Sequence, residues 1–381
     1  MKKIKLGDAC EILNGFAFKS ENYVGSGIRV IRISNVQKGY IEDNTPAFYP
    51  LETKGLEKYM LEEGDLLISL TGNVGRVAIL EKEFMPAALN QRVACLRLKT
   101  DKLSKRYLFH ILNSDFFEKQ CIQYSKGVAQ KNMSTAWLKD YEILLYSKEQ
   151  QELIADILDK MRLIKKSRYY ELQKLDELVK ARFVEMFGDP VTNDMLWNTD
   201  VLKDICTKIG SGSTPRGGKE SYIDEGISLI RSMNVHNAYF EYKDLAHITL
   251  DQAEKLNNVV VEHDDLLFNI TGASVARCCV VPSDVLPARV NQHVCILRCR
   301  EKINPIFLQE LLVNENYQGK LLQIAKSGAT REAINKQQLE SLEIVLPPLE
   351  LQNQFASFVQ EIDKSRLLSN HSLFLIKSIT F

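Results

Sequence analysis

The sequence lacks the segments that carry a protein into or across a membrane. No stretch approaches the roughly 18 consecutive apolar residues of a membrane span, and the basic start Met1–Lys5 is not followed by the apolar core of a signal peptide. The eight cysteines include no C-x-x-C pair and no histidine at ligand spacing, so zinc is not expected. Most of them lie in apolar, strand-like runs. We therefore expect a cytoplasmic protein with free thiols.

Catalytic signatures are also missing. The chain has no G-x-x-x-x-G-K-[ST] loop, no G-x-S-x-G elbow and no H-E-x-x-H pair. No glycine-rich turn between a strand and a helix indicates a nucleotide or methyl-donor site, and the Asn-Pro-Pro-aromatic tetrapeptide of amino-methyltransferases is absent. The six histidines are scattered. We therefore expect no catalytic residues, no metal site and no cofactor site in this chain.

No charge of either sign dominates. Lys and Arg together number 49, as do Asp and Glu. This balance argues against a general polyanion binder, but it allows DNA binding through local basic faces, because the distribution of charge determines the footprint. At 381 residues the chain is too long for one ordinary core and predicts two or three domains.

What the sequence does contain is a long internal repeat. The phrase "LNQRVACLRL" at residues 89–98 returns as "VNQHVCILRC" at residues 290–299, and "GDLLISLTG" (64–72) returns as "DDLLFNITG" (264–272). Further pairs recur at offsets of about 196 to 201 residues, so one long unit is used twice. A duplication that only enlarged a core is the alternative interpretation.

Two globular segments, 1–146 and 191–346, follow this repeat. In the first, short apolar runs punctuated by Gly, Asn and Pro predict strands at Ile28–Ile33, Leu66–Leu70, Arg92–Leu98 and Tyr141–Leu145. Helical spacing of apolar residues predicts one helix over Tyr107–Cys121.

A long helical segment, 147–190, follows the first globular segment. Residues 148–187 contain no Gly or Pro, and Gly188-Asp189-Pro190 ends the pattern. Spacings of three and four residues define a coiled-coil seam. Its members are Ile154, Ile157, Met161, Ile164, Arg168, Leu172, Leu175 and Val179.

A second helical segment, 347–381, has a weaker seam, made of Phe355, Val359, Ile362, Arg366, Ser369, Leu373 and Ile376. Each stripe needs a partner, and we expect the two helices to pair antiparallel, although each helix packing on its own domain is an alternative. The predicted fold class is α+β: two similar mixed α/β domains separated by two long helices that form an antiparallel coiled coil, with pseudo-two-fold symmetry.

Polar residues beside the predicted strands are candidates for contacting DNA. Arg and Lys suit guanine, Asn and Gln suit adenine, and hydroxyl groups suit phosphate. In the first repeat the candidates are Arg29, Arg32, Asn35, Asn73, Arg76, Asn90, Gln91, Arg92, Lys126, Gln130 and Lys131. In the second repeat they are Ser213, Thr214, Arg216, Lys219, Arg231, Asn234, Asn291, Gln292, His293, Lys326 and Arg331.

Each candidate group has a structural alternative. The glycines of "GSGSTPRGGKE" (210–220) would let the backbone approach a ligand closely, but the segment also fits a plain surface loop. Asn90–Arg92 and Asn291–His293 either reach base edges or satisfy the backbone of a turn. The segments around Asn73 and Arg277 fit structural turns.

Three phrases carry a family resemblance, together with the order of the segments along the chain: domain, helix, domain and helix. They are "LVKARFVEMFGDP" (178–190), "GSGSTPRGGKE" and "LPPLELQNQFASFV" (346–359). The chain resembles the specificity subunit of a Type I restriction–modification system over essentially its whole length.

The resemblance implies that segments 1–146 and 191–346 are target-recognition domains, each reading one half of a split, asymmetric DNA site. It implies that the coiled coil docks two methyltransferase subunits, which bind S-adenosylmethionine and methylate an adenine in each half-site. Restriction subunits that use ATP and magnesium would join them, and the specificity subunit itself would not be a catalyst.

The chain departs from this pattern in its second helical segment. That segment spans about 35 residues against about 44 for the first, and it lacks an F-G-D-P ending. A stand-alone DNA-modifying enzyme and a protein-binding scaffold remain the alternative functions.

Overall fold

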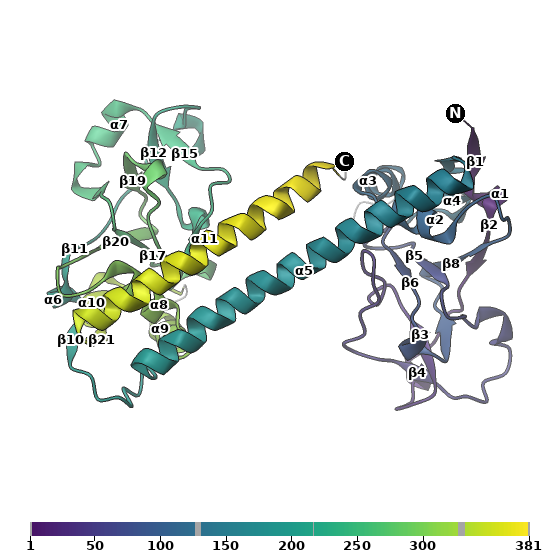
Figure 1. Cartoon of the computed structure of the whole chain (residues 1–381), viewed down its shortest axis with the longest axis horizontal. Helices are drawn as coiled ribbons and strands as arrows, with labels where there is room; N and C mark the ends of the chain where they lie inside the picture. Colours follow the sequence, from purple (N-terminus) through teal and green to yellow (C-terminus); the bar gives the residue numbers. More distant parts are fainter. Residues whose placement is uncertain (1, 126–130, 216, 327–331, 380–381) are drawn as a thin grey trace. The chain divides into compact units, whose positions relative to one another are not determined.

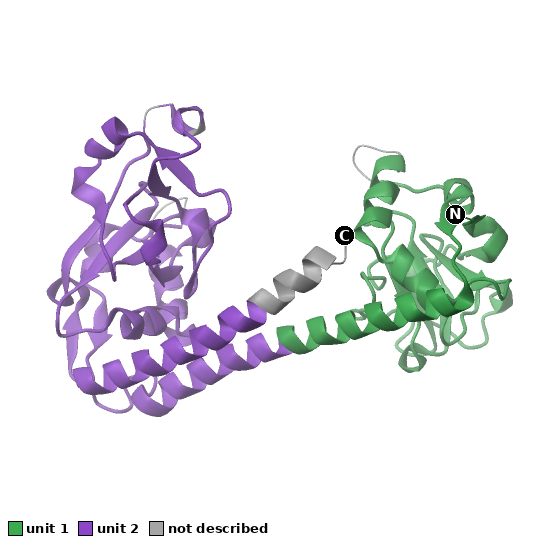
Figure 2. Cartoon of the chain, turned by 45° about the horizontal axis from the view of Figure 1, so that its top comes forward, with its two compact units in different colours: residues 1–169, 371–381 green, residues 170–370 purple. Residues whose placement is uncertain are grey.

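The computed structural model describes residues 2–125, 131–215, 217–326 and 332–379, with the side chains of residues 219 and 371–379 outside the description. Contacts between residues divide the chain into two compact units, coloured separately in Figure 2. Unit 1 comprises Met1–Tyr169 and His371–Phe381, and unit 2 comprises Tyr170–Asn370. The long helix α5 (Lys148–Phe187) contributes residues to both units.

Unit 1 is built on small sheets flanked by helices. Its strands are β1 (Lys3–Lys5), β2 (Cys10–Asn14), β3 (Ile28–Ile31), β4 (Phe48–Tyr49), β5 (Leu66–Ser69), β6 (Val77–Ile79), β7 (Ala87–Leu89), β8 (Val93–Leu98) and β9 (Glu142–Leu144). Its further helices are α1 (Leu6–Ala9), α2 (Lys105–Leu112), α3 (Asp115–Tyr124) and α4 (Thr135–Asp140). One antiparallel sheet has the order β2-β8-β5-β6, a second has the order β4-β3-β7 with β3 and β7 parallel, and β1 pairs with β9.

The predicted strands of unit 1 are confirmed, because each apolar run contains a strand, namely β3, β5, β8 and β9. Residues 66–69 of β5 are buried on both faces, which explains why the run is continuous rather than alternating. The single helix predicted over Tyr107–Cys121 is wrong, since α2 ends at Leu112 and α3 starts at Asp115. The hydroxyl of Ser114 caps α3 by accepting a hydrogen bond from the Phe117 amide at 3.2 Å, so the polar residues between the helices form a cap instead of continuing a helix.

Unit 2 repeats this plan. Its strands are β10 (Thr199–Val201), β11 (Cys206–Ser211), β12 (Ile227–Ile230), β13 (Val235–His236), β14 (Tyr239–Phe240), β15 (Ala246–Ile248), β16 (Val260–Val261), β17 (Leu266–Asn269), β18 (Cys278–Val280), β19 (Ala288–Val290), β20 (Val294–Cys299) and β21 (Glu343–Val345). Its further helices are α6 (Leu202–Ile205), α7 (Leu250–Glu254), α8 (Pro305–Val313), α9 (Glu315–Lys326), α10 (Lys336–Glu340) and α11 (Leu349–Ile379). The sheet β11-β20-β17-β18 matches β2-β8-β5-β6, and β15-β12-β19-β16 contains the counterpart of β4-β3-β7.

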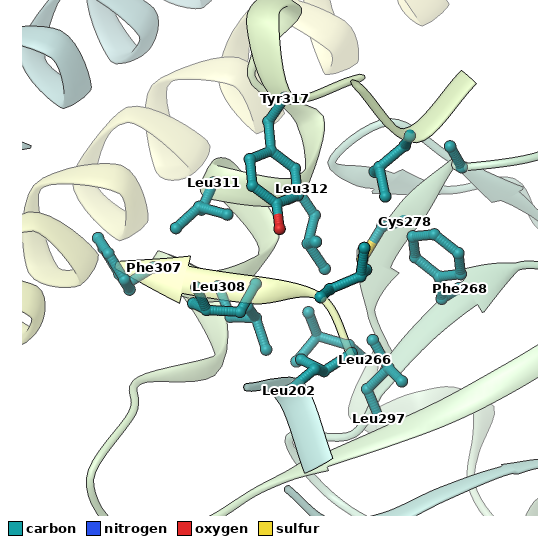
Figure 3. Close-up of a cluster of buried hydrophobic side chains, with 14 of the residues drawn as sticks. Leu202, Leu266, Phe268, Cys278, Leu297, Phe307, Leu308, Leu311, Leu312 and Tyr317 are labelled. Atoms are coloured by element: carbon teal, nitrogen blue, oxygen red, sulfur yellow. The ribbon is translucent and has the colours of Figure 1, made fainter. Parts of the chain in front are cut away.

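Side-chain contacts repeat along with the topology. Arg97 forms a two-pronged ion pair with the buried Asp65, at 2.9 and 2.7 Å, and Arg298 does the same with Asp265, at 2.8 and 2.9 Å. The predicted internal repeat is therefore present at the level of single contacts. Figure 3 shows part of the unit 2 core, a cluster that includes Phe268 of β17, Cys278 of β18 and Leu311 of α8.

Each long helix begins against its own globular segment through a buried glutamine. The side chain of Gln151 accepts from the Ser104 amide at 2.7 Å and donates to the carbonyls of Lys102 and Tyr146, both at 2.9 Å. Gln352 makes the matching set in unit 2, accepting from the Asn304 amide at 2.9 Å. Both glutamines are fully buried.

Within unit 2, the end of α5 pairs with α11. Phe183 and Phe187 contact Phe355 near the start of α11, whereas Asp176, earlier in α5, binds Arg366, later in α11, at 2.6 Å. The helices therefore run antiparallel, as predicted. The seam residues Phe355, Val359, Ile362 and Ser369 are buried, while Leu373 and Ile376 lie outside the described side chains.

Helix α5 stops where the sequence predicts. Gly188 has a φ of +72°, and its amide bonds the Val184 carbonyl at 2.9 Å, the left-handed ending that glycine favours. Of the predicted seam in unit 1, Ile154 packs on the core, but Ile157 and Ile164 are about half exposed, at 49% and 48%.

Candidate nucleic-acid interface

Four segments that are distant in the sequence meet at one end of the unit 2 sheets. They are the hairpin loop 231–244, the turn 270–277 between β17 and β18, the turn 291–293 before β20, and residues 332–334. The Ile270 amide bonds the His293 carbonyl at 3.0 Å, and the Gly272 amide bonds the Glu332 carbonyl at 2.9 Å. A polar surface thus forms where these loops lie side by side.

This surface is hollowed. A groove of about 1040 Å³ runs between the loops. Its lining is Ser232, Met233, His236, Thr271, Gly272, Ala273, Ser274, Arg277, His293, Glu332 and Ala333. One guanidinium, two imidazoles, one carboxylate and several hydroxyl groups therefore line a single concave region.

Side chains in the unit 2 surface are held by one another. Arg277 Nη1 lies 3.3 Å from His236 Nδ1, and the exposed Tyr239 stacks on the His236 ring with centroids 4.6 Å apart. Thr271 Oγ1 lies 2.6 Å from His293 Nδ1. Hydrogen bonds of this kind fix side chains in place before a ligand arrives.

Unit 1 has the same arrangement of segments with different side chains. The Leu70 amide bonds the Arg92 carbonyl, and the Gly72 amide bonds the Lys131 carbonyl, both at 2.9 Å. Arg76, the counterpart of Arg277, donates to the side chain of Gln37, which occupies the place of His236. Tyr40, at the tip of the hairpin, is 51% exposed, like Tyr239 at 54%.

Several candidates from the sequence hold their loops together instead of facing solvent. Asn35 and Asn234 are buried, accept from the amides of Arg32 and Arg231, and donate across the loop to the carbonyls of Glu42 and Glu241. Asn90 and Asn291 are also buried, and each accepts from the backbone amide two residues later, at 3.2 and 3.0 Å. The side chains of these four asparagines bond the backbone of their own loops. For Asn90 and Asn291 this is the structural alternative stated above.

Three arginine candidates are likewise engaged within the chain. Arg29 forms an ion pair with the buried Asp43 and lies over the Phe48 ring. Arg32 and Arg231 each donate to a carbonyl 13 residues further along, that of Thr45 and that of Asp244. They close the hairpin loops and are poorly placed to contact another molecule.

The remaining described candidates reach the surface. Exposed or partly exposed side chains are those of Asn73, Arg76, Gln91, Arg92, Lys131, Ser213, Thr214, Gln292, His293 and Lys326. The candidates Lys126, Gln130, Arg216 and Arg331, and the side chain of Lys219, lie outside the described residues.

One glycine of the 210–220 segment, Gly212, has a different use from the one considered above. A Cβ on Gly212 would lie 1.7 Å from the Val290 carbonyl oxygen, so glycine is needed for β11 to cross this chain's own turn. Gly15 has the same place in unit 1, 2.2 Å from the Asn90 carbonyl carbon.

Among the residues of this surface, sequence reasoning missed Gln37, Tyr40, His236 and Tyr239, and it interpreted the segment around Arg277 as a structural turn. The hairpins that carry them are very short, since β13 and β14 have two residues each. The one available signal was an exposed tyrosine at matching positions of the two repeats.

The described residues contain no group of three or more His, Cys, Asp or Glu placed to hold a metal ion. Nor do they contain a helix long and apolar enough to span a membrane. The cysteines are free, and burial raises the pKa of the Cys10 and Cys121 thiols to about 12, which leaves them protonated at neutral pH.

Comparison with known proteins decides the family. A family model described as the Type I restriction modification DNA specificity domain matches residues 1–174 and again residues 195–376. The chain belongs to this family. The two matches coincide with the two copies of the repeat, and the predicted function of a Type I specificity subunit is confirmed.

Relatives of this family extend over nearly the whole chain. The specificity subunit of Type I restriction enzyme EcoBI from Escherichia coli is 24% identical over 413 residues, covering 99% of this chain and 83% of that subunit. The specificity subunit of the putative Type I restriction enzyme MjaX from Methanocaldococcus jannaschii is 24% identical over 388 residues, covering 94% and 86%.

Solved structures of Type I systems share the fold. The S subunit from M. genitalium aligns with a TM-score of 0.64 at 14% identity, covering 100% of this chain and 93% of that one. A chain from a structure concerned with complex assembly and conformational transition of the type I R-M system aligns with a TM-score of 0.57 at 18% identity, covering 100% and 95%. The predicted fold class is confirmed.

Proposed function

We propose that each unit of this specificity subunit reads one half of a two-part DNA site through the surface formed by its hairpin loop and neighbouring turns. One observation carries the proposal: the two units present the same surface, with an arginine and an exposed tyrosine in common and different polar residues around them. The same backbone arrangement with different side chains suits an asymmetric site. The contacts that the two units share would position the DNA, and the contacts that differ would specify the bases.

The catalytic steps would belong to partner subunits. We propose that the chain docks two methyltransferase subunits, which bind S-adenosylmethionine and methylate adenine, and restriction subunits that use ATP and magnesium. Assembly of a Type I system is the subject of one of the related structures, which supports a subunit role. Exposed apolar residues on α5, with Leu153 at 61%, Ile157 at 49% and Leu163 at 66%, offer area for protein contacts.

The proposal is tested by binding to randomised duplex DNA at two salt concentrations, using the full chain with and without its methyltransferase subunits. We expect weak, strongly salt-dependent and unselective binding by the chain alone, because its net charge is near zero and only four of the described cationic candidates reach the surface, namely Arg76, Arg92, Lys131 and Lys326. Together with the methyltransferase subunits, the chain should select two short, different sequences.

Two results would contradict this proposal. An assembled complex that selects no sequence would remove the DNA-reading role. Transfer of methyl groups to DNA by the purified chain with S-adenosylmethionine, without partners, would show a catalyst in its own right.

A further inference from the structure

We propose that the turns Asn90–Arg92 and Asn291–His293 are the base-reading elements of their units, and that their third residue decides how they read. In unit 1, Arg92 contacts a guanine directly. In unit 2, His293 is a positioning residue that orients Gln292 toward an adenine. This inference rests on the proposed function and assigns its specificity to particular side chains.

The first residue of both turns has the same, purely local task. Asn90 and Asn291 are buried, and each side chain bonds the backbone amide of the third residue. The glycines Gly15 and Gly212 let the preceding strand cross directly over the turn. Both turns are therefore held rigidly, and the second and third residues are projected from a fixed backbone.

In unit 2 the next two side chains form a continuous hydrogen-bonded chain. Thr214 donates its hydroxyl to Gln292 Oε1, Gln292 Nε2 lies 3.2 Å from His293 Nε2, and His293 Nδ1 lies 2.6 Å from Thr271 Oγ1. Because an amide nitrogen only donates, His293 Nε2 accepts and its Nδ1 carries the proton. Gln292 is thus held from both ends while it remains exposed.

Unit 1 cannot build this chain. The segment that corresponds to Thr214 carries Phe16 and Phe18, whose rings lie 5.1 Å apart and pack with Tyr59 and Tyr49. The Thr71 hydroxyl, which corresponds to Thr271, is buried and has no hydrogen-bond partner in the described part of the chain. Arg92, in the place of His293, is exposed.

The chemistry of the two turns differs accordingly. A guanidinium pairs with O6 and N7 of guanine through two parallel hydrogen bonds, and a carboxamide pairs with N6 and N7 of adenine in the same way. A carboxamide reads adenine only if its oxygen and nitrogen are correctly oriented, which is what Thr214 and His293 provide in unit 2. Their bonds to Gln292 use one lone pair and one N–H, so an acceptor and a donor site remain for a base.

The test uses the full chain with its methyltransferase subunits and sequences the randomised duplex DNA that the complex retains. Arg92→Ala should lower the preference for guanine at one position of one half-site by between about fivefold and a hundredfold, and leave the other half-site unchanged. Gln292→Glu should move the preference at one position of the other half-site from adenine toward cytosine, since a carboxylate accepts from cytosine N4.

The role of His293 is tested by His293→Ala, which should weaken adenine preference at the same position that Gln292→Glu changes. A purely structural role for His293 would lower total DNA retention without changing any base preference. Lys99→Ala and Arg300→Ala are matched controls, since they remove a cation at the far end of β8 and β20, and should change no base preference.

The outcomes separate the two proposals. If the unmodified complex selects no sequence, the proposed function fails. If it selects two half-sites but the Arg92 and Gln292 variants select the same bases as the unmodified complex, the function stands and this inference is overturned. The same applies if His293→Ala and Gln292→Glu alter different positions.

Discussion

At the scale of single residues, the two copies of the repeat place different chemistry at equivalent positions. His110 on α2 and Glu310 on α8 hold corresponding places, and both are largely buried against long helices. His110 lies 2.8 Å from Asp159 of α5, while Glu310 accepts a hydrogen bond from Gln309 and interacts electrostatically with Arg366 of α11. Burial lowers the pKa of His110 and raises the pKa of Glu310 to about 7. The duplicated fold thus tolerates different titratable groups at one junction, and burial favours the neutral form of both.

Glu310 makes stability depend on pH. Its pKa is higher in the folded chain than the ordinary 4.5, so the folded state binds the proton more tightly. The free energy of unfolding therefore falls as pH rises from about 4.5 to about 7. Glu310→Gln keeps an acceptor for Gln309, whose amide donates to Glu310 Oε1 at 2.8 Å, and removes the titration.

We expect the effect of Glu310→Gln on the free energy of unfolding of the full chain to be more favourable at pH 8 than at pH 5, by about 1–3 kcal/mol. Each unit of pKa difference corresponds to about 1.4 kcal/mol. Denaturant unfolding at both pH values measures this. Glu315→Gln is the control, because Lys180 lowers the pKa of that exposed carboxyl and the trend should not appear. An equal effect of Glu310→Gln at both pH values would show that Glu310 does not titrate in this range.

At the scale of elements, the sequence predicted what depends on local patterns. Apolar runs predicted strands β5 and β8, and Gly188 predicted the end of α5. The break between α2 and α3 was missed because Ser114 caps a helix within a stretch whose apolar spacing continues through it. The roles of Arg32 and Arg231 were missed because their carbonyl partners lie across a loop, where sequence gives no geometry.

The candidate site also combines features that local sequence patterns predict with features that they do not. Repetition pointed to Asn90–Arg92 and Asn291–His293, but it did not distinguish the asparagines, which cap the turns, from the residues that follow them. That distinction depends on burial, which arises only when distant segments pack together.

The anchoring of each long helix by one glutamine gives an element-scale prediction. Gln151→Leu leaves the Ser104 amide and the Lys102 and Tyr146 carbonyls without their bonds, at a cost of about 1–3 kcal/mol for each buried group. The backbone amides of α2 should lose protection against hydrogen exchange, and those of α8 should keep it. Gln352→Leu should do the reverse, and Gln354→Leu, on an exposed face of α11, should change neither. Equal loss in both helices after either change would mean that the units do not unfold separately.

At the scale of the whole molecule, duplication supplies two frames and divergence makes them different. Each unit has its own sheets, its own core and its own anchored helix, so its surface is formed without residues from the other sheets. Side chains that read DNA can therefore change in one unit without disturbing the other. A specificity subunit built in this way can acquire a new target by replacing one half.

The final prediction follows from this independence. Replacing residues 1–146 by the matching segment of a related specificity subunit should change one half of the selected DNA site and leave the other half intact. The junction at Ser147 keeps α5 whole, but it separates Gln151 from its partners Lys102, Ser104 and Tyr146. The related subunit must therefore place equivalent backbone carbonyl and amide groups at those positions. Selection from randomised DNA by the assembled complex reads both halves in one experiment.

The reciprocal replacement of residues 191–346 is the matched control and should change only the half that the first replacement spared. A chimera that folds, as shown by hydrogen-exchange protection both in α8 and in the helix that replaces α2, and yet changes both halves together would mean that the two units read DNA as one surface.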